Sequence, residues 1–126
     1  MTRIASPIAA AALAALLAAA PAAAQEEPMT PQEAYYGYRA AVVAYERCND
    51  VRFDQAQANA IEERIAELMD TPLSPSDRLT IIEEARQDMS RLVAAQGCSA
   101  GNAPEVASAV ETFEAAIGPV IGLPAE

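Results

Sequence analysis

The sequence predicts an all-α fold, a small up-down-up-down bundle of about four helices held by one disulfide. Apolar residues recur with the period of an α-helix, and no segment alternates like a strand. Each periodic segment begins with residues typical of a helix start. The connections between segments are short, which favours antiparallel neighbours. The helices are expected at residues 31–48, 55–70, 75–96 and 103–117.

The first helix starts at a capping box formed by Thr30 and Glu33, with Pro31 at the first helical position. Proline is favoured there because the N–H that it lacks would have no partner within the helix. One face then carries a stripe of apolar or half-apolar side chains, which is predicted to be buried. The stripe consists of Tyr38, Ala41, Val42, Tyr45 and Cys48.

The second helix begins after Asp54, an N-cap residue that is followed three positions later by Gln57. This spacing is that of a capping box. The helix ends before Pro72, because the residue before a proline disfavours helical backbone. Its predicted buried face carries Ile61, Ile65 and Leu68.

The third helix has Ser74 as its N-cap and Asp77 in the position of the capping-box acid. Gly97 is expected to end it, since glycine readily adopts the left-handed conformation found after many helices. Its predicted buried face carries Leu79, Ile82, Ala85, Met89, Leu92 and Val93.

The fourth helix is expected to have Asn102 as its cap and Pro104 in its first turn. Gly118 and Pro119 end it. Its apolar seam consists of Val106, Val110, Phe113 and Ile117. The remaining apolar residues, from 118 onward, are predicted to form an irregular tail that lies against the bundle.

Residues 1–24 are predicted to be a secretory signal peptide that is cleaved after Ala24. A short basic start precedes an Ala-rich apolar stretch at 8–20, and the chain turns abruptly acidic after the predicted cleavage site. An uncleaved membrane anchor is the alternative, but Pro7 and Pro21 interrupt the apolar stretch, and alanine favours the bilayer less than leucine does.

The predicted mature chain is long enough for one domain with a modest core. Residues 25–29 are expected to be disordered, and residues 30–126 to form the single helical domain. Export places this domain in the periplasm or outside the cell, with no membrane insertion after cleavage.

The two cysteines, Cys48 and Cys98, are predicted to form a disulfide because exported proteins fold in an oxidising environment. Each falls at the C-terminal end of a helix, after the first and the third segments. In an up-down-up-down bundle these two ends lie together, so the crosslink is compatible with the topology.

The composition excludes several classes of function. The net charge of −10 disfavours binding to nucleic acid or to anionic lipid. The chain has no His and no Lys, so imidazole-based triads, imidazole zinc sites and Schiff-base chemistry are excluded. No catalytic residue, metal ligand or cofactor is therefore predicted. A hydrolase based on Glu62–Glu63 or Glu83–Glu84 is a less favoured alternative, since adjacent residues on a helix do not face each other.

The four tyrosines all lie on the first helix. Tyr38 and Tyr45 belong to the predicted buried face, whereas Tyr35, Tyr36 and Val43 extend the apolar character around the helix. Two interpretations follow. Either this helix is the centre of the bundle, or these three residues form a surface for a partner, to which tyrosine is well suited.

The general plan, a small exported helical domain with one disulfide between distant cysteines, resembles that of the acid-stress chaperones of the HdeA kind. The resemblance is architectural and carries over no functional residue. It implies a periplasmic stress chaperone as the alternative function. The leading hypothesis is a non-enzymatic binding or protein-interaction domain of the cell envelope, whose partner is another envelope protein. The oligomeric state is not predicted.

Overall fold

The computed structural model describes residues 28–122. The predicted signal peptide, residues 25–27 of the predicted disordered segment and residues 123–126 lie outside this range. The described part is all-helical, and the predicted small bundle is confirmed. Each predicted helix is present and begins and ends within two residues of its expected bounds. The elements are α2 (Pro31–Asn49), α3 (Gln55–Leu68), α4 (Pro75–Gln96), α5 (Pro104–Ala116) and the 3-10 helix η2 (Gly118–Ile121).

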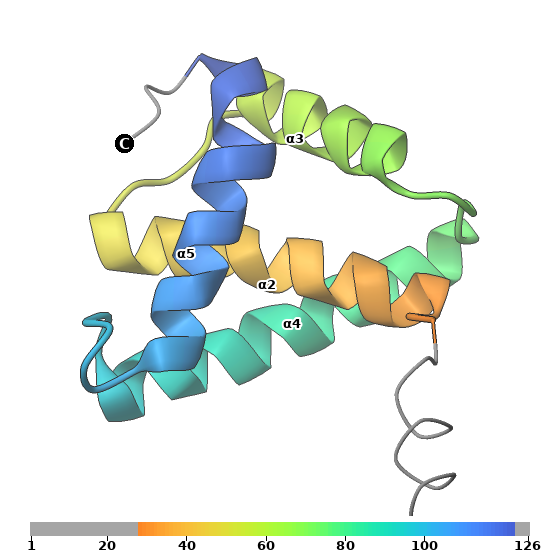
Figure 1. Ribbon diagram of the computed structural model, residues 1–126. Helices are drawn as coiled ribbons and strands as arrows, with labels where there is room; N and C mark the ends of the chain where they lie inside the picture. Colours follow the sequence, from red (N-terminus) through yellow and green to blue (C-terminus); the bar gives the residue numbers. More distant parts are fainter. Residues whose placement is uncertain (1–27, 123–126) are drawn as a thin grey trace, which may run out of the picture.

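Helix α2 is the centre of the fold. It packs against both α4 and α5, while α3 contacts η2. Figure 1 shows that α2, α3 and α4 alternate in direction and that α5 returns steeply across α2 and α4. Helices α4 and α5 pack extensively on α2 but little on each other. The two helices therefore diverge from each other over α2.

Local hydrogen bonds fix the helix starts. Thr30 Oγ1 accepts from the Glu33 N–H at 3.1 Å, and Glu33 Oε1 accepts from the Thr30 N–H at 2.9 Å. Asp54 and Gln57 form the second predicted capping box. Such reciprocal bonds satisfy N–H groups that have no partner within the helix.

The start of α5 differs from the prediction by one residue. Ala103, not Asn102, is the N-cap residue, and it makes no side-chain capping bond. The reason is a preceding turn, in which Ser99 Oγ accepts from the Asn102 N–H at 3.2 Å and Ser99 O accepts from the Ala103 N–H at 2.7 Å. This turn places Asn102 before the helix, while Pro104 still occupies the first turn.

Two apolar clusters make up the core, and α2 contributes to both. The first joins α2 to α3, α5 and the start of α4, and its buried members are Tyr35, Ala41, Val42, Ile61, Ile65, Ile81, Phe113 and Ile117. The second joins α2 to α4 and α5, and its buried members are Ala40, Val43, Ala44, Ala85, Met89, Ala103 and Val106. Of the stripe predicted on α2, Ala41 and Val42 are buried, whereas Tyr38, Tyr45 and Cys48 are half-buried. Because α2 is covered on two sides, it also buries residues outside that stripe.

The predicted face of α4 was wrong at its start. Leu79 is 68% exposed, and Ile81 is buried in its place. Ile81, Ala85 and Met89 follow one another at intervals of four residues, so these three lie on the side of α4 that meets α2. Leu79 points away from that side.

The C-terminal segment is more regular than predicted. Residues from 118 were expected to be irregular, but Gly118–Ile121 form η2. Ile117 and Gly118 are buried, and Gly118 lies close to the ring of Phe113. The segment lies against the bundle, as predicted, and contacts α3 and α5.

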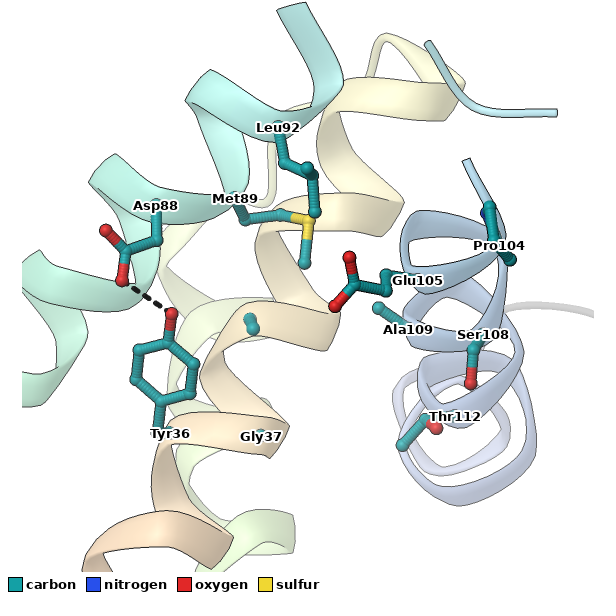
Figure 2. A pocket seen from close by; sticks show the side chains of 11 residues that line it. Tyr36, Gly37, Asp88, Met89, Leu92, Pro104, Glu105, Ser108, Ala109 and Thr112 are labelled. Atoms are coloured by element: carbon teal, nitrogen blue, oxygen red, sulfur yellow. Dashed lines mark hydrogen bonds between the residues drawn. The ribbon is translucent and has the colours of Figure 1, made fainter. Parts of the chain in front are cut away.

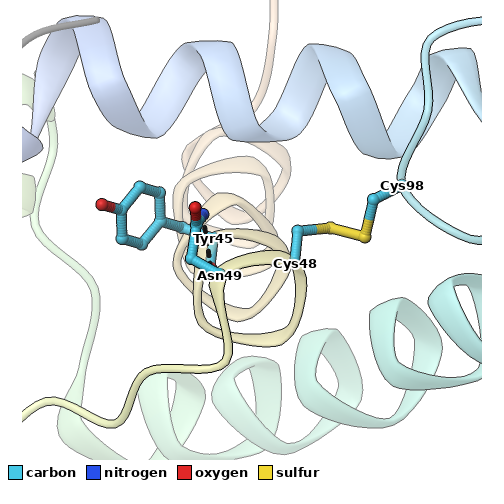
Figure 3. Close-up of a disulfide and its surroundings, with 4 residues drawn as sticks. All are labelled: Tyr45, Cys48, Asn49 and Cys98. Carbon is cyan, nitrogen blue, oxygen red and sulfur yellow. Dashed lines mark hydrogen bonds between the residues drawn. A yellow bond between two sulfur atoms is a disulfide. The ribbon is translucent and has the colours of Figure 1, made fainter.

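The predicted disulfide is confirmed. Figure 3 shows Cys48 in the last turn of α2 bonded to Cys98, which follows the end of α4. The two Cα atoms are 5.8 Å apart, a normal separation for a bridged pair. The bond therefore joins the ends of α2 and α4. In the described part of the chain, no helix is long and apolar enough to cross a membrane.

Candidate functional site

A groove of about 510 Å³ lies where α2, α4 and α5 diverge. Gly37 of α2 lies at its floor, Met89 and Leu92 of α4 form one wall, and Ala109 of α5 belongs to the other (Figure 2). Ala40 of α2 also lines the groove. The groove exists because the α2 residues here are small and because α4 and α5 hardly touch each other. Its volume lies within the range of about 300 to 1,000 Å³ that is typical of ligand sites.

Gly37 is the residue in this groove that the fold does not explain. It lies inside α2, it is exposed, and its φ angle is not in the left-handed region. A Cβ atom built on it would meet nothing within 4 Å. Glycine in a helix interior costs about 1 kcal/mol of stability relative to alanine. Neither a turn nor close packing requires glycine here. The effect of the missing side chain is that the space above Gly37 stays open as part of the groove.

A polar edge on the α4 side consists of Tyr36 and Asp88. The Tyr36 hydroxyl donates to Asp88 Oδ2 at 2.6 Å, and Asp88 Oδ1 accepts from the Arg91 guanidinium at 2.6 Å. Partial burial, followed by this hydrogen bond to a carboxylate, raises the pKa of Tyr36 to about 12. Tyr36 therefore remains a neutral donor at physiological pH, and both oxygens of Asp88 are engaged.

Glu105 lies on the opposite side, in the first turn of α5. Figure 2 shows its side chain extending from α5 toward Met89, into the groove. Among the described residues, no hydrogen bond or ion pair involves its carboxylate. The groove thus combines an apolar floor with acidic groups on two sides.

A second polar cluster surrounds Glu62 on α3. Its Oε2 accepts from the Tyr35 hydroxyl at 2.7 Å, its Oε1 lies 3.3 Å from Arg39 Nη1, and Arg78 Nη1 is 4.0 Å from Oε2. Burial and the Glu62 carboxylate raise the pKa of Tyr35 well above its usual value. The cluster ties α3 to α2 and to α4, so we assign it a structural role.

A third feature is a polar hollow of about 480 Å³ at the C-terminal end of α2, which brings Arg47, Arg52 and Arg86 together. Arg86 is already paired with Glu83, and Glu46 lies in the same hollow. Nearby acids therefore offset much of the arginine charge. Within residues 28–122, no group of three or more acidic or cysteine side chains is placed to hold a metal ion.

The predicted partner surface is corrected by the burial of two of its three residues. Tyr35 is 2% exposed and Val43 is 7% exposed, because α2 is covered on both sides. These two side chains belong to the core and offer no surface. Tyr36 is half-buried and lies at the edge of the groove.

Sequence reasoning missed Gly37, Asp88 and Glu105 as site residues. One signal for Gly37 was present, since a glycine inside a helix that has strong start signals requires an explanation. Nothing in the sequence pattern indicated that Asp88 and Glu105, on different helices, would lie beside it.

No protein-family model matches this chain, and neither a curated protein nor a solved structure is detectably similar to it.

Proposed function

We propose that this protein is an exported, non-enzymatic protein-interaction domain of the cell envelope and that the groove between α2, α4 and α5 is its binding surface. The observation that carries the proposal is Gly37. A residue that weakens its own helix and meets no packing need lies on the floor of an apolar groove. The basis for export is the signal-peptide pattern at residues 1–24, with which a disulfide agrees.

The shape and lining of the groove favour a polypeptide segment as the partner. Apolar side chains from three helices line an open trough, which is suited to the side chains of a segment laid across it. Helices commonly bind in apolar grooves of this kind, with a few anchoring side chains supplying most of the affinity.

The test is the substitution Gly37→Leu, which places a large side chain on the floor of the groove. The Cβ atom of the added side chain meets nothing within 4 Å, so the fold is expected to persist, while the partner is expected to bind about tenfold more weakly or worse. The oxidised protein, produced from the full-length chain, is used to capture proteins from envelope extract. The captured proteins are then quantified for the wild type and the variant.

The matched control is Gly37→Ala, which adds one methyl group and leaves most of the groove open. It is expected to retain capture and to raise the free energy of unfolding by about 0.5–1 kcal/mol, because alanine favours the helix. Equal capture by the wild type, Gly37→Ala and Gly37→Leu would show that the groove is not the binding surface.

The second candidate function is an exported acid-stress chaperone, and the placement of Glu62 favours it. This single carboxylate accepts from Tyr35 and pairs with Arg39 and Arg78, so it holds α3 against two other helices. Loss of its charge would remove both ion pairs. Helix α3 would then loosen from the apolar surface that it covers.

Glu62→Gln imitates that loss at neutral pH. It is expected to lower the free energy of unfolding by about 1 kcal/mol, because the ion pairs are partly exposed, and to increase the binding of an apolar dye. Glu63→Gln, an exposed neighbour, is the control. The chaperone function itself requires that the wild type suppress aggregation of a client protein at acid pH. No protection at an equal molar ratio eliminates it.

A further inference from the structure

We infer that the groove binds a basic side chain of the partner, a lysine or arginine whose aliphatic stem lies on the apolar floor and whose charged end reaches Glu105. The inference rests on the proposed function and adds the chemistry of the segment that is bound.

The charge at the groove favours a cation. The two charged residues that line it, Asp88 and Glu105, are both acids. Glu84 and Arg91 are close enough to affect Tyr36, and the Arg91 side chain is 71% exposed and paired with Asp88. The local field is therefore negative, in a chain whose net charge is −10. An acidic segment would be repelled, and a purely apolar one would cover a carboxylate without giving it a partner, which is costly.

Glu105 is the acid that a ligand can engage. The oxygens of Asp88 already accept from the Tyr36 hydroxyl and from Arg91. A helix dipole favours an acid in the first turn of α5, which accounts for a glutamate at position 105. The dipole does not account for the direction of the side chain, because the same carboxylate directed into solvent would satisfy it equally. The side chain, which remains exposed, extends over the groove toward Met89 (Figure 2).

The apolar floor favours a cation that carries an apolar stem. Met89 lies between the polar edge at Asp88 and the carboxylate of Glu105 (Figure 2), and Ala40 and Ala109 also line the groove. Lysine and arginine both carry an apolar stem that packs on such a surface, and a charged end that reaches past it. A small inorganic cation would gain nothing from the floor.

The experiment uses short acetylated and amidated peptides that differ only at a central residue, which is lysine, norleucine or glutamate. Norleucine keeps the aliphatic stem of lysine without its charge. Binding to the isotope-labelled oxidised protein is followed by NMR through the backbone amide of Gly37. The lysine peptide is expected to bind about threefold to fivefold more tightly than the norleucine peptide, as for a partly exposed ion pair. The glutamate peptide is expected to bind most weakly.

Glu105→Gln is expected to reduce the affinity for the lysine peptide to that for the norleucine peptide. Glu111→Gln makes the same charge change on the exposed part of α5, outside the groove, and is expected to leave the preference for lysine intact. Equal binding of the lysine and norleucine peptides, or equal effects of the two variants, would overturn the inference. The proposed function would survive that result if Gly37→Leu still weakened capture about tenfold or more, and it would fail if capture were unaffected.

Discussion

Reduction of the Cys48–Cys98 bond is expected to lower the free energy of unfolding by roughly 4 kcal/mol. The bond closes a loop with a sequence separation of 50. In the chain-entropy account, breaking the bond increases the conformational entropy of the unfolded chain. The unfolded state is thereby stabilised relative to the folded state. A domain of this size has a total stability of about 5–15 kcal/mol. The reduced protein is therefore expected to be partly or wholly unfolded at growth temperature.

The measurement is urea denaturation of the oxidised protein and of the double variant Cys48→Ser, Cys98→Ser, followed by circular dichroism. The single variants serve as controls, since each breaks the same bond while changing one side chain. The double variant is also expected to lose binding at the groove, because the bond joins the ends of α2 and α4, which form its floor and one wall. An unchanged denaturation midpoint would contradict the prediction.

Helix ends could be predicted from the sequence because the forces that set them are local. The capping box at Thr30 and Glu33 needs only residues that are neighbours in the chain. The same holds for the end of α4 at Gly97, whose φ of 82° is in the region that glycine favours. The disulfide was also predictable, because a chain with two cysteines allows one pair. Where a short turn preceded the helix, as at Ser99, the prediction was off by one residue.

Which residues of a helix face the core was harder to predict, because it depends on which helices pack against each other. The pattern on α4 could not distinguish Leu79 from Ile81, and only the position of α2 decides that Ile81 is buried. Similarly, the sequence left open whether Tyr35 and Val43 lie in the core or on a partner surface, because it does not show how many sides of α2 are covered. The groove itself could not be predicted from the sequence, because it arises from the divergence of α4 and α5 over Gly37.

The stacked aromatic rings around Phe113 link the central helix to the last two elements of the chain. Phe113 on α5 is fully buried. Its ring centroid lies 4.4 Å from that of Tyr45 on α2 and 5.6 Å from that of Phe53, and both pairs are stacked. Gly118 packs close to the same ring. Since this ring contacts α2, the segment before α3 and the start of η2, few other side chains hold as many parts of the fold together.

Phe113→Ala is expected to lower the free energy of unfolding by about 3–5 kcal/mol, which includes the loss of buried apolar area and the cavity left behind. The stacking with two aromatic neighbours adds to this cost. Phe113→Leu, which keeps most of the volume, is expected to cost less than half as much and serves as the control. Urea denaturation of the oxidised variants provides the measurement. If Phe113→Ala destabilised the protein no more than Phe113→Leu, α5 would have to be held to α2 chiefly by the second cluster, through Val106 and Ala103, rather than by this ring.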